Sequence, residues 1–267
     1  MHLINDFQPK LAGFLANVTL TNCPHALLIK GDHGCGKHLF VQGLSRVLAL
    51  PCRNFTEDVI EDTLDASFKA ATERTPAIYL IEADKLSIKD QNALLRTVEN
   101  PIKSVYFVII VTGYILPTIA NRCYTLEFQE YSIHDLRTLY PNVSDPLLQA
   151  CRTPGRVELY KSIELESYIK LLDNMFANFS RANLSNILTI PNKFAWGRAS
   201  SSDMDFDLFL LLLRERVANT AKTNSTCLPL YKDILNLVEK CSVAHVDKKR
   251  LFESFLLSAK EANYSWS

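Results

Sequence analysis

A glycine-rich octapeptide is the part of this sequence whose residue types and spacing predict a definite chemistry. Residues 31–38 read Gly-Asp-His-Gly-Cys-Gly-Lys-His and fit the pattern G-x-x-x-x-G-K of a phosphate-binding loop. In such a loop the glycines let backbone N–H groups point into one concavity, and the following helix adds the positive end of its dipole. A tight strand-to-helix turn is the alternative interpretation, but the lysine favours a nucleotide site with ATP as the expected ligand. The residues expected to bind it are Gly31, Gly34, Cys35, Gly36, Lys37 and His38.

The last position of the loop departs from the usual pattern. A serine or threonine normally stands there and gives a hydroxyl oxygen to Mg²⁺, whereas this sequence has His38. Magnesium prefers hard oxygen ligands, so an imidazole is a poor substitute. The sequence therefore predicts nucleotide binding through the backbone and Lys37, which would reach the β- and γ-phosphates, and it argues against a normal Mg²⁺ site.

A second group of candidate residues follows the short apolar run that ends at Glu82. Hydrolysis on such a loop needs a carboxylate for the metal at the end of a neighbouring strand, and commonly a base that positions water. Glu82 is the candidate for the first role, and Asp84 could replace it if the turn is one residue shorter than usual. Both acids could equally be ordinary strand-end and turn residues. The position after Glu82, often glutamate in active ATPases, is Ala83, so hydrolysis by this chain alone is expected to be weak or absent.

The apolar pattern supplies the elements that must hold these residues in place. Short apolar runs predict strands at 25–30, 77–82 and 104–112, the last of them β-branched and aromatic. Apolar residues at intervals of three and four predict helices within 1–22 and at 38–50, 60–74 and 89–99. Strands that alternate with helices are typical of a parallel sheet covered on both faces, so we predict an α/β domain with the phosphate loop after its first strand.

The pattern changes after residue 127, and the rest of the chain reads as helical. Helices are predicted at 133–139, 146–152, 157–173, 205–220, 230–241 and 246–263. A loop is predicted at 191–202, which contains three consecutive serines. We therefore expect three parts, namely an α/β nucleotide-binding domain at 1–128, a small helical lid at 129–163 and an all-helical domain at 164–267.

Composition narrows the classes of function. The chain has 267 residues, of which 48% are hydrophobic, and its 29 lysines and arginines balance 29 aspartates and glutamates. A net charge of zero excludes a protein held on DNA or on an anionic membrane mainly by its own positive charge. The seven cysteines form no C-x-x-C pair, so no zinc site is expected. With neither a signal peptide nor an apolar run of about 18 residues, we expect a cytoplasmic protein without membrane contact.

Four blocks of sequence occur in the order typical of one protein family. They are Pro24–Ile29 before the phosphate loop, Tyr79–Leu86 with Asn92–Pro101, Leu116–Cys123, and Thr153–Arg156. On these blocks the chain resembles the clamp-loader subunits of the AAA+ class, above all the delta-prime subunit of bacterial DNA polymerase III. The family's fold is a P-loop parallel-sheet domain, a small helical lid and a helical collar through which subunits assemble. Beyond residue 156, only the helical character of that collar is similar.

The resemblance implies roles for individual residues. Lys37 matches the Walker A lysine, and Thr112 stands where the family places the sensor-1 residue that senses the γ-phosphate. Arg122 matches the arginine that, in the family, points across a subunit interface at a neighbour's ATP. Arg156 lies near the family's sensor-2 position, for which Gly155 is the alternative.

The resemblance also implies a function. The chain would assemble with other clamp-loader subunits and help to open a sliding clamp on primer–template DNA, with Arg122 as its arginine finger. Two departures are that Cys52 alone stands where relatives carry a four-cysteine zinc module, and that Asn121 replaces the serine before Arg122. The alternatives are an ATP-hydrolysing subunit of the tau/gamma type, in which Glu82 or Asp84 holds the metal, and a small-molecule P-loop kinase.

Overall fold

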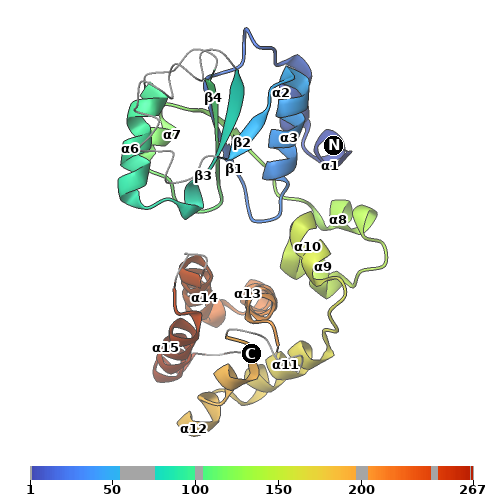
Figure 1. Ribbon diagram of the computed structural model, residues 1–267. Coiled ribbons are helices and arrows are strands. Elements are labelled where there is room, and N and C mark those ends of the chain that lie inside the picture. Colours follow the sequence, from blue (N-terminus) through green and yellow to red (C-terminus); the bar gives the residue numbers. More distant parts are fainter. Residues whose placement is uncertain are drawn as a thin grey trace. The chain divides into compact units, whose positions relative to one another are not determined.

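Two compact units make up the chain (Figure 1). The computed structural model describes residues 2–54, 76–99, 105–196, 204–241, 246–264 and 266, and the helix predicted at 60–74 lies outside them. Unit 1 is Met1–Asp135 with Thr153–Gly155, and unit 2 is Leu136–Arg152 with Arg156–Ser267. The short segment around residue 154, from the expected lid, thus belongs with the α/β part. The three-part division at residues 128 and 163 stays a prediction.

A five-stranded parallel sheet forms the centre of unit 1. Its strands, in the order β2-β3-β4-β1-β5, are β1 (Ala26–Lys30), β2 (Cys52–Asn54), β3 (Ala77–Glu82), β4 (Val105–Val111) and β5 (Tyr124–Glu127). The three predicted strands are confirmed to within one residue at either end. The sequence analysis missed β2 and β5, because these short strands expose most of their side chains and so carry no continuous apolar run.

Helices cover both faces of the sheet. They are α1 (His2–Phe7), α2 (Pro9–Asn17), α3 (Lys37–Leu48), α6 (Ile88–Glu99) and α7 (Pro117–Ala120), with α8 (Ile133–Leu139) at the border of the unit. In Figure 1, α1, α2 and α3 lie on one face of the sheet, and α6 and α7 on the other. The helical stretch expected within 1–22 is two helices, because Pro9 has no N–H to continue α1 and instead begins α2.

The side chains of the central strands form the core between these layers. Leu28, Ile81 and Ile109 are fully buried, and Leu94 and Val98 of α6 belong to the same apolar cluster. Burial of each such side chain stabilises the fold by roughly 1.5–3 kcal/mol. The core therefore fixes where each strand ends, and the polar residues of the candidate site follow those ends.

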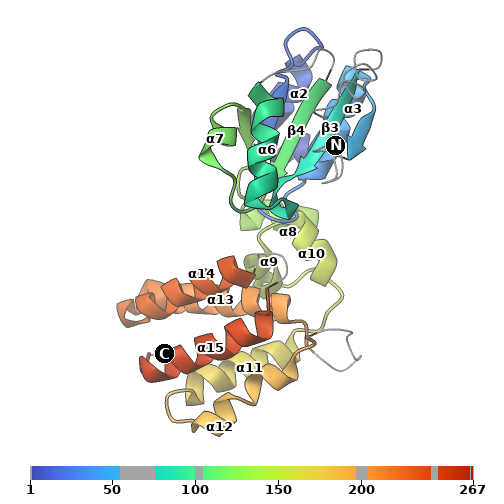
Figure 2. The same cartoon turned by 60° about the vertical axis from the view of Figure 1, so that its left-hand side comes forward.

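Unit 2 is helical. Its helices are α9 (Asp145–Cys151), α10 (Pro154–Tyr160), α11 (Glu166–Asn178), α12 (Leu184–Ile187), α13 (Phe206–Thr223), α14 (Leu228–Cys241) and α15 (Lys248–Glu261). The first two residues of α10 are grouped with unit 1. α13 packs against α9, α11 and α14, and α14 packs against α15 (Figure 2). The single helix predicted at 157–173 is wrong, since the chain leaves α10 at Tyr160 and begins α11 only at Glu166. The amide of Ile163 bonds to the carbonyl of Tyr160, three residues back, and this bond closes the turn between the helices.

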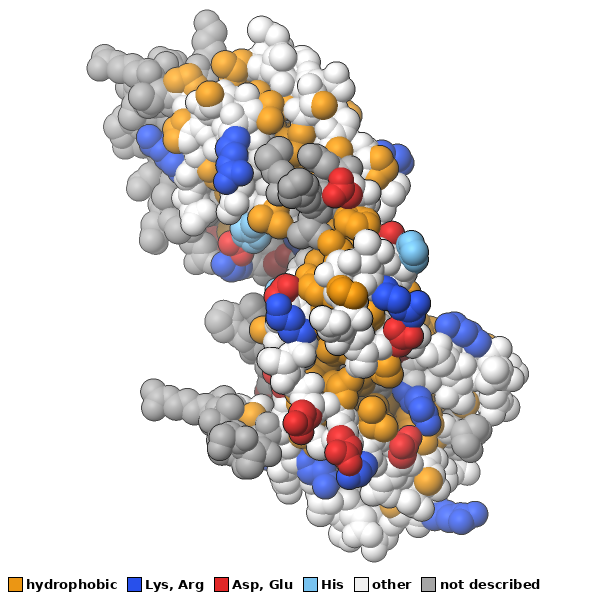
Figure 3. Space-filling view, turned by 90° about the vertical axis from the view of Figure 1, so that its right-hand side faces the viewer, with side chains coloured by type: hydrophobic (Ala, Val, Ile, Leu, Met, Phe, Trp, Pro, Cys, Tyr) orange, Lys and Arg blue, Asp and Glu red, His pale blue; other side chains and the backbone are white. Residues whose placement is uncertain are grey.

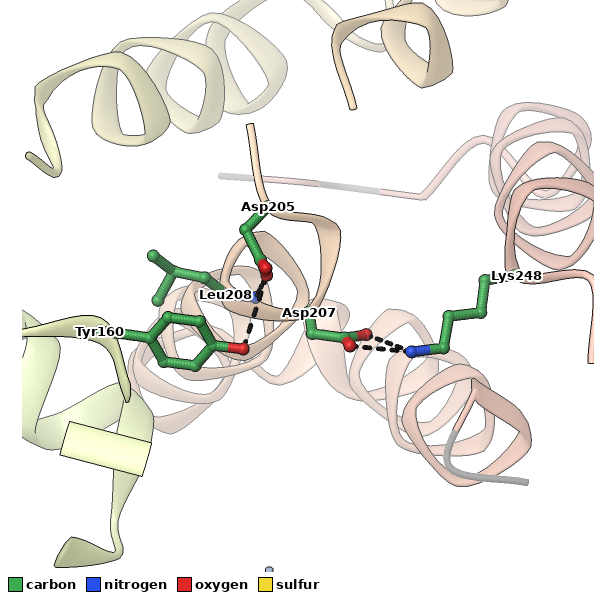
Figure 4. Close-up of polar contacts among 5 residues, drawn as sticks. All are labelled: Tyr160, Asp205, Asp207, Leu208 and Lys248. Atoms are coloured by element: carbon green, nitrogen blue, oxygen red, sulfur yellow. Dashed lines mark hydrogen bonds and ion pairs between the residues drawn. The ribbon is translucent and has the colours of Figure 1, made fainter. Parts of the chain in front are cut away.

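Hydrogen bonds fix the start of α13 (Figure 4). The Asp205 carboxylate caps the helix by accepting a hydrogen bond of 2.8 Å from the amide of Leu208, and the Tyr160 hydroxyl donates to the same oxygen at 3.5 Å. Burial raises the pKa of Tyr160 and the Asp205 charge raises it further, so the hydroxyl stays a donor. In the first turn of α13, Asp207 pairs with Lys248 of α15 at 2.7 Å. Two aspartates thus connect α13 to α10 and α15.

The surface of the described residues carries mixed charge. On the face shown in Figure 3, lysine and arginine side chains are interspersed with aspartate and glutamate. This distribution agrees with the formal net charge of zero. Within the described ranges, no helix is both long and apolar enough to cross a membrane.

Candidate nucleotide site

Three strand ends meet at one edge of the sheet. Lys30 at the end of β1 pairs with Val111 at the end of β4, and Glu82 at the end of β3 pairs with Ile110. Parallel strands place their carboxyl ends at the same edge, where ligands of α/β proteins bind. The loop at residues 31–36 therefore leaves the sheet beside the ends of β3 and β4.

The glycines of the loop are required by its geometry. Gly34 and Gly36 have φ angles of 78° and 110°, in the left-handed region that side chains with a Cβ rarely adopt. At Gly31 a Cβ would lie 2.7 Å from the Cys35 sulfur and 2.8 Å from the Cβ of Phe128. The local concentration of glycine in the sequence thus reflects two special backbone conformations and one close approach.

Lys37, the first residue of α3, points back into the loop. Its Nζ donates hydrogen bonds to the carbonyls of Gly31 (2.7 Å) and Asp32 (3.0 Å) and to the Thr112 hydroxyl (2.8 Å). The residue is 8% exposed. The structure therefore brings together the two residues for which the resemblance implied contacts to the phosphates, although 75 positions separate them in the sequence. Their roles toward a nucleotide stay predictions.

Cys35 takes part through its backbone. Its carbonyl accepts a 3.0 Å hydrogen bond from the Tyr131 hydroxyl, and its side chain is buried. Burial raises the pKa of the Cys35 thiol, although Lys37 opposes the shift, and burial likewise raises the pKa of Tyr131 to about 12. A neutral, buried thiol is a packing group, so any contact of Cys35 with a phosphate would come from its N–H.

Asp84 holds the end of β4 in place. It lies in the short 3₁₀ helix Ala83–Lys85, directly after β3. One carboxylate oxygen accepts a hydrogen bond from the amide of Thr112 (2.8 Å), and the other accepts one from the amide of Gly113 (2.9 Å). Both oxygens are thus used to position Thr112, whose hydroxyl in turn accepts the hydrogen bond from Nζ of Lys37. The alternative role of Asp84, as the acid that binds the metal, stays a prediction.

Glu82 lies between two basic side chains. One of its oxygens is 2.7 Å from Nζ of Lys85 and the other is 3.6 Å from Nε2 of His38. Partial burial raises the pKa of Glu82, but Lys85 and His38 together outweigh this effect and lower the pKa below its ordinary value. At neutral pH the side chain is therefore an anion that already has a cationic neighbour, Lys85.

These residues do not fit the Mg²⁺ ion that a phosphate loop implies. His38 offers a nitrogen where an oxygen is needed, and both Glu82 oxygens face basic groups. Among the residues that the structure describes, no group of three or more His, Cys, Asp or Glu side chains could hold a metal ion.

A segment from far along the chain docks on the loop. The Thr153 hydroxyl donates to the carbonyl of His33 (2.8 Å), and the amide of Gly155 donates to the carbonyl of Gly34 (2.9 Å). A Cβ on Gly155 would lie 2.7 Å from Cα of Gly34, so the approach is as close as a glycine allows. Gly155, weighed above for the sensor-2 position, thus contacts the loop through its backbone. Arg156, the next residue, is grouped with unit 2, and its role stays a prediction.

Arg122 follows α7 and is half-exposed. Its Nε lies 2.6 Å from a carboxylate oxygen of Glu99 on α6, and its Nη1 donates to the carbonyl of Thr118 at 2.9 Å. The guanidinium is therefore held by its own chain, and its role as an arginine finger stays a prediction.

Sequence reasoning missed the partners of the predicted site residues. The positions of Arg122, Glu82 and Asp84 were identified, but Glu99 and the backbone amides that Asp84 binds were not. One of these partners could have been predicted from the sequence, because Lys85 follows Glu82 at a spacing of three residues and so lies within reach of its carboxylate. The others depend on the tertiary fold.

Together these features define a class of protein. A phosphate loop between the first strand of a parallel sheet and the helix that follows it, with acidic residues at the end of a neighbouring strand, is the arrangement of a P-loop α/β domain. The predicted fold class, an α/β domain of this kind followed by helices, is confirmed.

Comparison with known proteins points to a family within this class. Residues 53–132 match the family model described as DNA polymerase III, delta subunit, so the predicted resemblance is confirmed over this part of the chain. A gamma subunit-related protein of DNA polymerase III from Thermotoga maritima is similar in structure, with 13% identity, 95% of this chain and 99% of that chain covered, and a TM-score of 0.48. The RuvB Holliday junction branch migration motor of Thermotoga maritima has 14% identity, 95% and 87% coverage, and a TM-score of 0.42. No curated protein matches the sequence.

Replacing Gly155 tests the docking of its segment on the phosphate loop. We expect Gly155→Ala to lower the free energy of unfolding by about 1–3 kcal/mol, because its methyl group would overlap the backbone of Gly34. Gly13→Ala is the matched control, since Gly13 lies within α2 with nothing within 4 Å of an added Cβ. There we expect a gain of roughly 0.5–1 kcal/mol from helix propensity. Urea unfolding followed by circular dichroism measures both free energies. If both variants changed the free energy of unfolding in the same direction, the docking contact would be contradicted.

A pair of alanine variants tests whether Asp84 contributes more to stability than Glu82. We expect Asp84→Ala to destabilise the chain by about 1–3 kcal/mol, since two backbone amides lose their acceptor. Glu82→Ala should cost less than about 1 kcal/mol, because its ion pairs are exposed to solvent. The same urea experiment decides the order, and a larger cost for Glu82→Ala would refute the positioning role of Asp84.

Proposed function

We propose that this chain is a clamp-loader subunit of the DNA polymerase III delta type. It assembles with other AAA+ subunits, helps to load a sliding clamp on primed DNA, and offers Arg122 to the ATP of a neighbouring subunit. Its own hydrolysis of ATP is weak or absent. The observation that carries the proposal is the match of residues 53–132 to the delta-subunit family model. That segment contains Glu82, Asp84 and Arg122.

The placement of the acids supports the absence of hydrolysis. Hydrolysis on a phosphate loop needs a metal held near the transferred phosphate and a group that orients the attacking water. Here Glu82 is paired with Lys85 and His38, Asp84 binds two amides, and Ala83 has no polar side chain. The loop and Lys37 are nevertheless built as in a nucleotide site. These features favour a pocket that binds ATP without turning it over.

The charge of the molecule supports a shared contact with DNA. A chain with zero net charge and interspersed surface charges gains little non-specific affinity for phosphates. Contact with primer–template DNA would then come through the assembled complex, in which several subunits each contribute a few groups.

Replacing Arg122 tests the arginine finger. In a complex reconstituted from this chain and the other clamp-loader subunits of its source, we expect Arg122→Ala to lower ATP hydrolysis at the neighbouring site by roughly 10²-fold or more. The physical reason is that a planar, permanently charged guanidinium stabilises the charge that develops on the transferred phosphoryl group. Steady-state phosphate release and clamp-loading rates are the measurements.

The matched control is Arg137→Ala. Arg137 is also an exposed arginine in a 2.6 Å pair, with Asp145, and it lies outside the segment that matches the family. We expect this variant to load clamps at the normal rate. Unchanged hydrolysis and loading with Arg122→Ala would rule out the finger, and a failure of the chain to join the complex at all would rule out the clamp-loader function.

Turnover by the isolated chain separates the proposal from an ATP-hydrolysing subunit of the tau/gamma type. We expect phosphate release at the background rate both for the natural chain and for Lys37→Ala, because the acids needed for hydrolysis are engaged elsewhere. Release that the natural chain supports and Lys37→Ala abolishes would establish the tau/gamma-type alternative instead.

A further inference from the structure

Basic side chains lie beside the phosphate loop, in the region where other phosphate loops hold a metal ion. His38 is the second residue of α3, directly after Lys37, and its Nε2 lies 3.6 Å from Glu82 at the end of β3. Lys85 approaches the other Glu82 oxygen at 2.7 Å from the turn that follows β3. The contact between α3 and β3, which a bridging ion makes elsewhere, is therefore made by side chains of this chain alone.

The two basic residues differ in how strongly they oppose a metal. The side chain of Lys85 is 72% exposed, so its pair with Glu82 is worth about 0–1 kcal/mol and would give way to a divalent ion. His38 has the larger effect, because it replaces the residue whose hydroxyl oxygen normally binds the metal. Of the usual hydroxyl and carboxylate ligands, the Glu82 carboxylate then remains. The side chains of this protein would therefore add little to the affinity for a Mg²⁺ ion that arrived with a nucleotide.

The remaining groups of the loop attract phosphates without needing a metal. The backbone amides of the loop and the dipole of α3 attract anions whatever ion accompanies them. Lys37 is buried among the loop carbonyls and Thr112, so its ammonium group is held beside the loop by the chain itself. Affinity for the phosphates thus comes from groups that belong to the chain.

We propose that this pocket binds a nucleoside triphosphate independently of divalent cations, with His38 and Lys85 on the Glu82 carboxylate where a metal would otherwise join the loop to the sheet. The inference rests on the nucleotide pocket of the proposed function, and it adds that Mg²⁺ is not part of that pocket. It does not depend on clamp loading, which requires assembly rather than a bound metal in this subunit.

Titration calorimetry with ATPγS, a slowly hydrolysed analogue of ATP, tests the proposal on the full chain. We expect dissociation constants that agree to within about threefold in excess Mg²⁺ and in EDTA. Binding that is roughly tenfold or more tighter with Mg²⁺ would overturn the proposal. Absence of binding in both buffers would also overturn it, since the loop would then be a structural remnant.

Variants that restore the usual ligands sharpen the test. We expect His38→Ser to make binding several-fold tighter in Mg²⁺ than in EDTA, and His38→Ser with Lys85→Ala to widen that ratio to roughly tenfold or more. Lys89→Ala is the matched control, an exposed lysine at the start of α6 and four residues after Lys85, and should keep the ratio near one. If His38→Ser and the double variant both stay independent of Mg²⁺ while melting like the natural chain, the assignment of His38 and Lys85 is wrong.

A measurement of assembly distinguishes a failure of metal-independent binding from a failure of the clamp-loader function. The same preparations are mixed with the other clamp-loader subunits and examined by gel filtration. Metal-dependent binding together with normal assembly overturns the inference alone, whereas metal-independent binding without assembly overturns the clamp-loader function alone.

Discussion

The hydrogen bond between the ammonium of Lys37 and the hydroxyl of Thr112 is the contact on which the rest of the site depends. It joins the helix after β1 to the end of β4 at 2.8 Å. Thr112 is in position to accept it because both oxygens of Asp84 hold the amides of residues 112 and 113. Three adjacent strands, β1, β4 and β3, are thereby tied together at one edge of the sheet by groups that also surround the phosphate loop.

This arrangement has a consequence for the acids at that edge. An acid whose two oxygens each accept a hydrogen bond from a backbone amide has fewer lone pairs left for a metal. Turning it toward a metal would release the strand end that it holds, and two lost hydrogen bonds cost about 1–3 kcal/mol. Glu82 is under a weaker constraint, since its partners are exposed side chains. The two acids that the sequence offers for hydrolysis are therefore occupied for different reasons, one by the backbone and the other by basic side chains.

The sequence was sufficient for the parts of this site that depend on local pattern. The apolar run that ends at Glu82 and the glycine spacing of the loop follow from short-range rules, and both lie where they were predicted. The partners of Asp84 and Arg122 were beyond such rules, because they are set by strand order and by the packing of α6 on the sheet. The docking of Gly155 on Gly34 joins positions more than a hundred residues apart, and no local pattern marks it. Strands β2 and β5 were missed because strands with exposed side chains lack the apolar run on which prediction relies.

The pair between Arg122 and Glu99 is weak enough to be compatible with the proposed arginine finger. An unpaired guanidinium on the surface would be well solvated, so its pair with Glu99, in which both side chains are 42% exposed, contributes about 0–1 kcal/mol. Transfer of the arginine to a triphosphate would exchange one carboxylate oxygen for several phosphate oxygens, which a planar fork binds more strongly. The free energy needed to break the pair of Arg122 with Glu99 is then small compared with the free energy gained from binding the triphosphate at an interface that excludes water. The exchange is possible only when a neighbouring subunit brings its nucleotide to α6 and α7, so the finger would act in the assembled complex and rest against its own chain otherwise.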